Sequence, residues 1–146
     1  MDESHPEPPF AGLSPHSPLY ADDGRSVSAL TYYVRLVTRR RRPFFADADV
    51  RARAEALLEA SAAALGCRIE ACAVSPSAVS LAVTAPPEVS PHVLVTRLRH
   101  DVAGPLKEEF EDVRRAGAVF VRRYLVSTVP IPEGDDEAFE RVVSKA

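Results

Sequence analysis

Residues 75–84 show an alternation of apolar and small side chains that is typical of a β-strand. The apolar set is Val79, Leu81 and Val83, and the set that alternates with it is Ala78, Ser80, Ala82 and Thr84. Because successive side chains of a strand point to opposite faces, the apolar set is predicted to face a core. The small set is predicted to face a cleft, a second element of the fold or solvent.

Similar patterns predict three further strands. Residues 29–38 are rich in Tyr, Val, Leu and Thr, with Tyr32, Val34 and Leu36 on one face and Tyr33, Arg35 and Val37 on the other. Residues 67–74 form a second strand, whose short connection to the strand at 78–84 predicts an antiparallel hairpin. A fourth strand is predicted over residues 118–128.

Capping residues and helical spacing predict the first helix. Asp47 or Asp49 is expected to cap it, and Gly66 is expected to end it just after Leu65. Its apolar stripe contains Val50, Ala54, Leu57, Leu58, Ala62 and Leu65.

A second helix is predicted to start at Ser90-Pro91, with serine as the N-cap and proline at the first position. Gly104-Pro105 is predicted to interrupt this helix, which then resumes as a shorter helix over residues 106–115. Asp135 and Asp136 are expected to open a final short helix. The apolar side of that helix is predicted to contain Phe139, Val142 and Val143.

This order of elements predicts an α+β fold of the ferredoxin-like, split βαβ kind. It has a four-stranded antiparallel sheet with helices on one face, plus the short C-terminal helix. Residues 1–27 are rich in proline and acidic residues and lack apolar periodicity, so they are predicted to form a disordered tail. Residues 28–146 are predicted to form the single domain.

Composition limits the classes of function. The chain has 146 residues, 46% of them hydrophobic, and a net charge of −3, so any basic signal for nucleic acid must be local. Cys67 and Cys72 are predicted to be unpaired, because their spacing places them on opposite faces of a strand. No apolar run approaches the ~20 residues of a membrane span. We therefore expect a cytoplasmic protein with no membrane partner, and the content of Ala, Arg and Val suggests a bacterial one.

Several segments, taken in order, resemble one family. Residues 32–45, which read Tyr-Tyr-Val-Arg-Leu-Val-Thr, four arginines and Pro-Phe-Phe, are similar to the opening strand of the HUH single-tyrosine, insertion-sequence-200-like transposases. Residues 75–83 resemble that family's Met-Pro-Asp-His-Val-His-Leu-Leu-Val strand. Residues 106–110, with Leu98, resemble its second helix, and residues 123–129 its last strand. The resemblance covers about Leu30 to Val143.

The resemblance implies a chemistry that this sequence lacks. The family needs two histidines at i and i+2 of one strand to hold a divalent metal, and a tyrosine on the terminal helix to attack DNA. The histidine positions match Ala78 and Ser80. The tyrosine position matches Val142, or Glu140 if the loop at 130–134 carries no extra residues, and a further metal ligand matches Ala146. We therefore expect no catalytic residue, no metal and no other cofactor.

The remaining histidines and tyrosines do not restore this chemistry. None of His5, His16, His92 and His100 has ligand spacing to another histidine. His92 is expected to be an exposed polar residue in the first turn of its helix. Tyr124 matches a strand tyrosine of the family and not its nucleophile.

Local positive charge supplies a candidate DNA-binding set: Arg39, Arg40, Arg41, Arg42, Arg97 and Arg99. Guanidinium groups match phosphate oxygens, and Arg122 and Arg123 would extend the set. The alternative is a solvated turn whose charge is offset by the acidic tail. Asp101, Val102 and Gly104 stand where the family is basic, which favours that alternative.

These observations predict a catalytically inactive homologue of a single-strand DNA transposase that retains dimerisation and binding of single-stranded or hairpin DNA. The resemblance implies a homodimer through sheet edges, and residues 119–126 have the apolar and β-branched content for such pairing. The alternative is a protein-interaction or scaffold domain with no DNA binding. An enzyme with another site ranks last, because the sequence contains no carboxylate, Cys–His or Gly-rich constellation.

Overall fold

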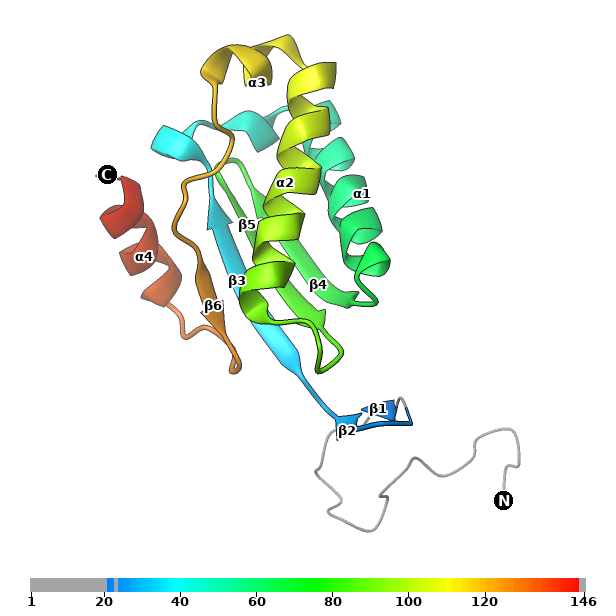
Figure 1. The fold of residues 1–146 in the computed structure, drawn as a ribbon. Coiled ribbons are helices and arrows are strands. Elements are labelled where there is room, and N and C mark those ends of the chain that lie inside the picture. Colours follow the sequence, from blue (N-terminus) through cyan, green and yellow to red (C-terminus); the bar gives the residue numbers. More distant parts are fainter. Residues whose placement is uncertain (1–20, 23, 145–146) are drawn as a thin grey trace, which may run out of the picture.

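The computed structural model of the chain describes residues 21–22 and 24–144 (Figure 1). Most of the tail predicted over residues 1–27 lies outside the described residues, as do His5, His16, Tyr20 and Ala146. The described end of that segment contains a two-stranded antiparallel ladder of β1 (Ala21–Asp22) and β2 (Val27–Ser28).

Four strands form the main sheet, in the order β4-β5-β3-β6, and every neighbouring pair is antiparallel. The strands are β3 (Thr31–Val37), β4 (Arg68–Ser75), β5 (Ala78–Thr84) and β6 (Leu125–Ser127). The predicted hairpin is formed by β4 and β5, and β3 lies between β5 and β6. The predicted α+β, ferredoxin-like arrangement is therefore confirmed.

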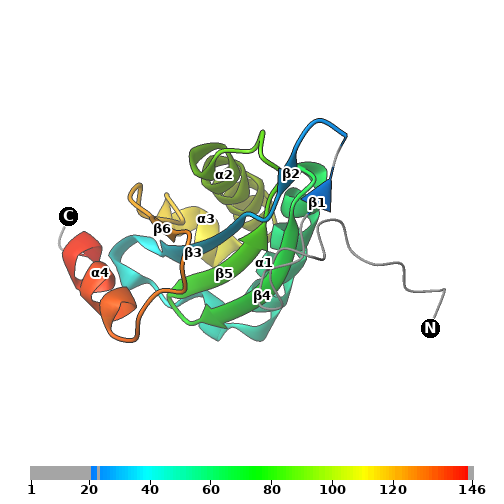
Figure 2. The ribbon, with the colours of Figure 1, turned by 90° about the horizontal axis from the view of Figure 1, so that it is seen from below.

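The helices divide between the two sides of this sheet. They are α1 (Ala48–Ala64), α2 (Pro91–Glu109), α3 (Glu111–Ala116) and α4 (Asp135–Ser144), and two 3₁₀ turns, η1 (Arg39–Arg41) and η2 (Phe44–Ala46), connect β3 to α1. In Figures 1 and 2, α1 and α2 lie together on one side of the sheet, and α4 lies away from them. The face opposite to α1 and α2 is called the open face below.

Two N-caps fix where the long helices begin. The Asp47 side chain accepts hydrogen bonds from the amides of Asp49 and Val50, and the Ser90 side chain accepts one from the amide of Val93. These bonds satisfy amides that would otherwise lack a partner in the first turn of a helix. The predicted starts of both helices are confirmed.

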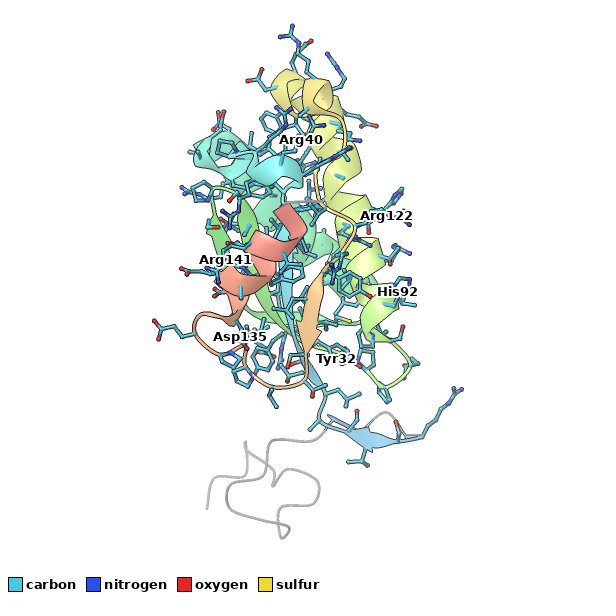
Figure 3. The ribbon with its side chains drawn as sticks, turned by 90° about the vertical axis from the view of Figure 1, so that its left-hand side faces the viewer. Tyr32, Arg40, His92, Arg122, Asp135 and Arg141 are labelled. Atoms are coloured by element: carbon cyan, nitrogen blue, oxygen red, sulfur yellow. The ribbon has the colours of Figure 1, made fainter. Side chains whose placement is uncertain are left out.

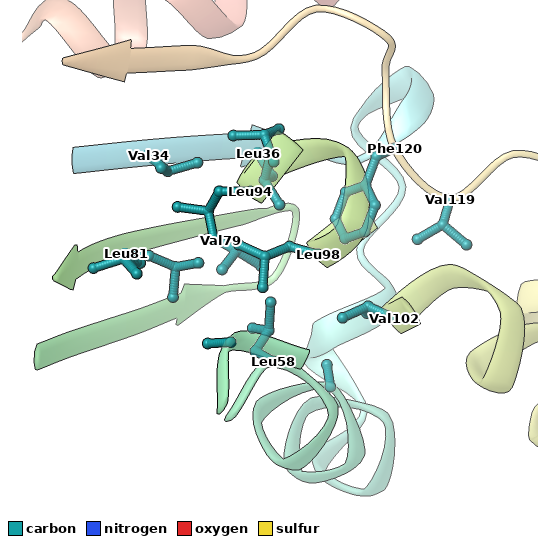
Figure 4. Close-up of a cluster of buried hydrophobic side chains, with 14 of the residues drawn as sticks. Val34, Leu36, Leu58, Val79, Leu81, Leu94, Leu98, Val102, Val119 and Phe120 are labelled. Carbon is teal, nitrogen blue, oxygen red and sulfur yellow. The ribbon is translucent and has the colours of Figure 1, made fainter. Parts of the chain in front are cut away.

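The core lies between the sheet and the two long helices (Figure 4). Side chains from β3 and β5 meet side chains from α1 and α2, and the largest fully buried ones include Leu36, Leu58, Val79, Leu94 and Leu98. The alternation predicted for residues 78–84 holds, because Val79, Leu81 and Val83 all belong to this core. Ser80 and Ala82 are half-buried on the open face.

The predicted interruption at Gly104-Pro105 is wrong, since α2 runs without a break from Pro91 to Glu109. Pro105 has no N–H to donate to the preceding turn, which costs a helix about 3 kcal/mol. The neighbouring Val102 and Leu106 are both fully buried, and burial of such side chains contributes about 1.5–3 kcal/mol each. Core packing therefore offsets the proline, and the helix ends instead at Phe110, whose backbone is extended.

The fourth strand is shorter than predicted, because only Leu125–Ser127 pairs regularly with β3. Phe120 forms an isolated bridge with Thr38. Between these points, the Arg99 guanidinium donates hydrogen bonds to the carbonyl oxygens of Val121 and Arg122. A side chain from α2 thus satisfies carbonyl groups that a longer strand would have paired. Among the described residues, no helix combines the length and apolar character that a membrane crossing requires.

Candidate functional site

A polar cluster lies on the open face, where the resemblance would place a metal. Arg35 of β3 pairs in register with Ser80 of β5, so both side chains point away from the core. The Arg35 Nη1 atom donates a hydrogen bond to the Ser80 hydroxyl oxygen. The Arg35 side chain is only 13% exposed, so the guanidinium is largely removed from water.

The C-terminal helix α4 supplies the acidic partners of this guanidinium. Arg35 Nη2 lies 2.5 Å from Oε1 of Glu140, and Arg41 Nη2 lies 3.4 Å from Oε2 of the same carboxylate. Asp136, one turn earlier on α4, lies 3.7 Å from Arg35. Because both Arg35 and Glu140 are 13% exposed, removing one partner would leave a largely desolvated charge unpaired, which costs more than breaking an ion pair on the surface.

A cavity of about 760 Å³ opens beside this cluster. Its floor is the sheet, with Tyr33, Arg35, Ser80 and Ala82 among the lining residues. Its rim is the loop 130–134 and the first turn of α4. Of the small residues predicted to face a cleft, a second element or solvent, Ser80 and Ala82 line this cavity, whereas Ala78 is buried.

The residues at the metal positions do not fit a divalent cation. Ala78 has no donor atom, and the Ser80 hydroxyl accepts its hydrogen bond from a positively charged guanidinium, which would repel a metal ion. Within residues 21–22 and 24–144, no three His, Cys, Asp or Glu side chains form a group that could hold a metal. Ala146, the remaining ligand position, lies outside the described residues.

The residues that the resemblance matches to the nucleophile are Val142 or Glu140, and neither is a tyrosine. Val142 is 56% exposed, so its predicted place on the apolar side of α4 is wrong. That side is formed by the buried Val143 and the half-buried Phe139. At about 100° per residue, Val142 lies about 160° around the helix from Glu140 and about 100° from Val143, so it falls outside the side that these two residues turn toward the sheet. The residue that faces the cluster is Glu140.

A second candidate site lies where η1 approaches the segment that leads into β6. One cavity of about 390 Å³ is lined in part by Arg39, Arg122 and Arg123. An adjoining cavity of about 320 Å³ is lined in part by Arg99, His100, Lys107 and Arg122. The two cavities share Phe120, and no acidic residue of the described chain lines either one. We call these six residues the basic surface: Arg39, Arg99, His100, Lys107, Arg122 and Arg123.

The arginine turn η1 borders the basic surface in a strained conformation. Arg40 and Arg41 have φ angles of 57° and 53°, a left-handed conformation that costs a residue with a side chain about 1–2 kcal/mol. Figure 3 shows Arg40 beyond the C-terminal end of α4, and Arg122 on the segment that leads into β6. Three of the four arginines, Arg39 to Arg41, are in η1, and all four are exposed.

The two helical arginines of the predicted DNA-binding set have partners within the chain. Arg97 lies 3.4 Å from the carboxylate of Asp101 on the same helix. Arg99 lies 5.3 Å above the ring of Tyr124, in addition to its bonds to Val121 and Arg122. His92 is exposed, as predicted, and its Nδ1 lies 2.9 Å from the Tyr124 hydroxyl. Arg99 therefore joins the basic surface while also holding its backbone in place.

Sequence reasoning missed Arg35 as a site residue and Lys107 and His100 as members of the basic surface. A signal for Arg35 was present, because a charged residue in the middle of a strand and opposite to its apolar set needs a partner. Residues 118–122 approach α2 in the folded chain and so place Arg122 near His100 and Lys107. No local sequence pattern encodes that approach.

Comparison with known proteins identifies the family. The sequence profile described as "Transposase IS200 like" matches residues 26–136. Comparison with curated proteins gives no match. Nine chains of solved structures match the fold, two of which are the following. A candidate transposase from Deinococcus radiodurans R1 has 20% identity and a TM-score of 0.72, over 86% of this chain and 96% of that one.

The second structure is a REP-associated tyrosine transposase bound to a REP hairpin. It has 10% identity and a TM-score of 0.54, over 84% of this chain and 68% of that one. At these identities the two structures support the fold alone. The family assignment rests on the sequence profile, which covers most of the chain. The predicted resemblance is thereby confirmed: the chain belongs to the IS200-like transposase family.

Proposed function

We propose that this protein is a catalytically inactive member of the IS200-like transposase family that binds single-stranded or hairpin DNA. The observation that carries the proposal is the basic surface beside the arginine turn, in a chain whose net charge is −3. Cationic residues gathered on one face of an acidic protein favour binding to phosphate groups. The hairpin bound by the second solved structure suggests the class of DNA.

Inactivity is supported by what occupies the open face. A nucleophilic tyrosine must lie beside a metal or another group that activates the phosphate. Here the terminal helix presents Glu140, and the strand presents Ala78 and Ser80. A carboxylate beside a bound phosphodiester would repel it.

Exposure and strain support a binding role for the arginine turn. Strained backbone persists where the surrounding structure imposes it, and such residues are enriched at ligand-binding sites. The bonds from Thr38 and Arg39 to neighbouring carbonyl groups hold the turn in place. The exposed guanidinium groups are thus presented from a fixed backbone, which lowers the entropy lost on binding.

DNA binding is tested by fluorescence anisotropy with a labelled hairpin oligonucleotide over a range of salt concentrations. The triple variant Arg39→Ala/Arg40→Ala/Arg122→Ala is expected to bind more weakly and to flatten the plot of log K against log salt. The slope should fall by roughly 0.7–0.9 for each phosphate group that the variant no longer neutralises. Arg97 and Arg99 also belong to the proposed set, but both have partners within the chain. Arg97→Ala should therefore weaken DNA binding less than replacement of Arg39, Arg40 or Arg122.

A charge-matched control uses three arginines in surface ion pairs elsewhere: Arg53→Ala/Arg68→Ala/Arg114→Ala. This control should bind as the wild-type protein does, apart from the general effect of its lower charge. If both triple variants lose affinity equally, the basic surface is not the binding site. If the wild-type protein binds no DNA, the protein-interaction or scaffold alternative replaces the proposal.

We also propose that the protein forms a homodimer through sheet edges and is located in the cytoplasm of a bacterium. The sheet order places β4 and β6 at the two edges, and residues 119–126 lie at the β6 edge. Edge strands offer unpaired backbone groups to a second copy. Light scattering after size exclusion should give about twice the mass of 15.9 kDa, and a monomer at all concentrations would contradict the dimer.

A further inference from the structure

The carboxylate of Glu140 is held as a bound anion would be. Each of its oxygens contacts a different arginine, with Oε1 facing Arg35 and Oε2 facing Arg41. Arg35 also donates to Ser80, which fixes the plane of its guanidinium. Two guanidinium groups that converge on one carboxylate form the kind of site that binds phosphate.

The Arg35 guanidinium has a donor to spare. Its Nε atom is buried and has no hydrogen-bond partner among the described residues. An unsatisfied buried donor costs about 1–3 kcal/mol, so a native structure tends to retain it for a reason. A tetrahedral phosphate presents more acceptor oxygens than the single carboxylate now does.

The charges of the adjoining cavity separate by structural segment. From the sheet, Arg35 is the one charged residue among those that line the cavity. The acidic lining residues, Glu133, Asp136 and Glu137, all come from the loop and the first turns of α4. When this segment moves away, the negative charges leave with it, and the sheet face that remains is positive.

The segment that carries Glu140 is attached more weakly than the core. It is a ten-residue helix that follows a connection containing Pro130 and Pro132. Its described apolar anchors are the buried Val143 and the half-buried Phe139. Short terminal helices with few buried side chains open at lower free energy than the core of a domain.

We propose that Arg35, which Ser80 orients, and Arg41 form a binding site for a phosphate group of a DNA strand, and that Glu140 on α4 closes this site in the resting protein. The helix acts as an autoinhibitory element, because its carboxylate competes with the phosphate for the same two arginines. This inference rests on the proposed DNA-binding function and adds to it a second, closed phosphate site on the open face.

The test compares Glu140→Gln with Glu137→Gln, which removes the same charge from the acidic lining of the cavity but from a residue that does not contact Arg35 or Arg41. Each variant is titrated with the labelled hairpin oligonucleotide and, separately, with inorganic pyrophosphate. We expect Glu140→Gln to bind both probes about tenfold more tightly than Glu137→Gln, a typical size for such competition. In the NMR spectrum, pyrophosphate should shift the Arg35 Nε–H signal in Glu140→Gln and not in the wild-type protein.

A double variant, Arg35→Gln/Glu140→Gln, identifies the source of any gain. It should lose the tighter binding, and its thermal melt shows whether it is folded. Equal affinities of Glu140→Gln and Glu137→Gln for pyrophosphate would overturn the inference, as would a gain that survives in a folded double variant. The pyrophosphate titration decides this without DNA, so failure of the wild-type protein to bind the hairpin would refute the proposed function separately.

Discussion

Removal of the Glu140 carboxylate should release α4 from the sheet without unfolding the core. The perturbation is Glu140→Ala, which leaves the Arg35 guanidinium with Ser80 and with Asp136 at 3.7 Å. The main anchors of α4 that remain are Val143 and Phe139. Because these are few, the helix is expected to open locally.

The magnitude follows from the burial of the pair. Breaking a fully buried ion pair costs about 3–5 kcal/mol, and this range is the upper limit for the pair of Arg35 and Glu140. An exposed pair contributes about 0–1 kcal/mol. Both partners are 13% exposed, and Asp136 remains as a second, more distant acid, so we expect about 2 kcal/mol. At 1.4 kcal/mol for each factor of ten, this corresponds to roughly 30-fold more frequent opening of α4.

Native-state hydrogen exchange followed by NMR measures this opening directly. Amides of α4 should exchange roughly 30-fold faster in Glu140→Ala, while amides of β3 and β5 should keep their rates. Glu137→Ala is the control, because it removes the same charge from the same helix at a residue that does not contact Arg35 or Arg41. If the two variants exchange alike in α4, the ion pair does not hold the helix and the reasoning is refuted.

Three further predictions concern stability and thiol chemistry. Asp47→Ala should lower the free energy of unfolding by about 1 kcal/mol in a urea melt, because two amides of α1 lose their acceptor; no change would mean that the cap is replaced by water. Pro105→Ala should raise that free energy by up to about 2 kcal/mol, because the helix regains an N–H, although the freer unfolded chain offsets part of the gain; a loss would show that the proline ring itself packs. The pKa of the exposed Cys72 thiol is raised by partial desolvation and by the negative charges of Glu55 and Glu59, so iodoacetamide should modify it more slowly than a free thiol at pH 8. Glu55→Gln/Glu59→Gln should speed that reaction, and an unchanged rate would mean that desolvation alone raises the pKa of Cys72.

The elements with strong local signals were predictable from the sequence. Asp47 and Ser90 mark helix starts through their own side chains, and the alternation at residues 78–84 assigns each residue to a face. The order of elements then restricts the sheet to few topologies. The family could also be inferred, because the arginine turn and the strand after Pro76 keep their order and spacing.

Features that depend on tertiary contacts were not predictable in the same way. The continuation of α2 through Pro105 depends on the burial of Val102 and Leu106 against partners distant in sequence. The short β6 depends on Arg99, which reaches across from α2. The pair of Arg35 and Glu140 joins residues 105 positions apart, and only the fold brings them together.

The central claim is that this member of the family binds DNA without attacking it. The most direct measurement incubates the wild-type protein with Mn²⁺ and an end-labelled hairpin oligonucleotide, then runs each sample on native and denaturing gels. The label should move with the protein on the native gel and run as free, uncleaved DNA on the denaturing gel. Label that stays with the protein after denaturation, with mass spectrometry placing the link on a tyrosine such as Tyr33, would contradict the claim.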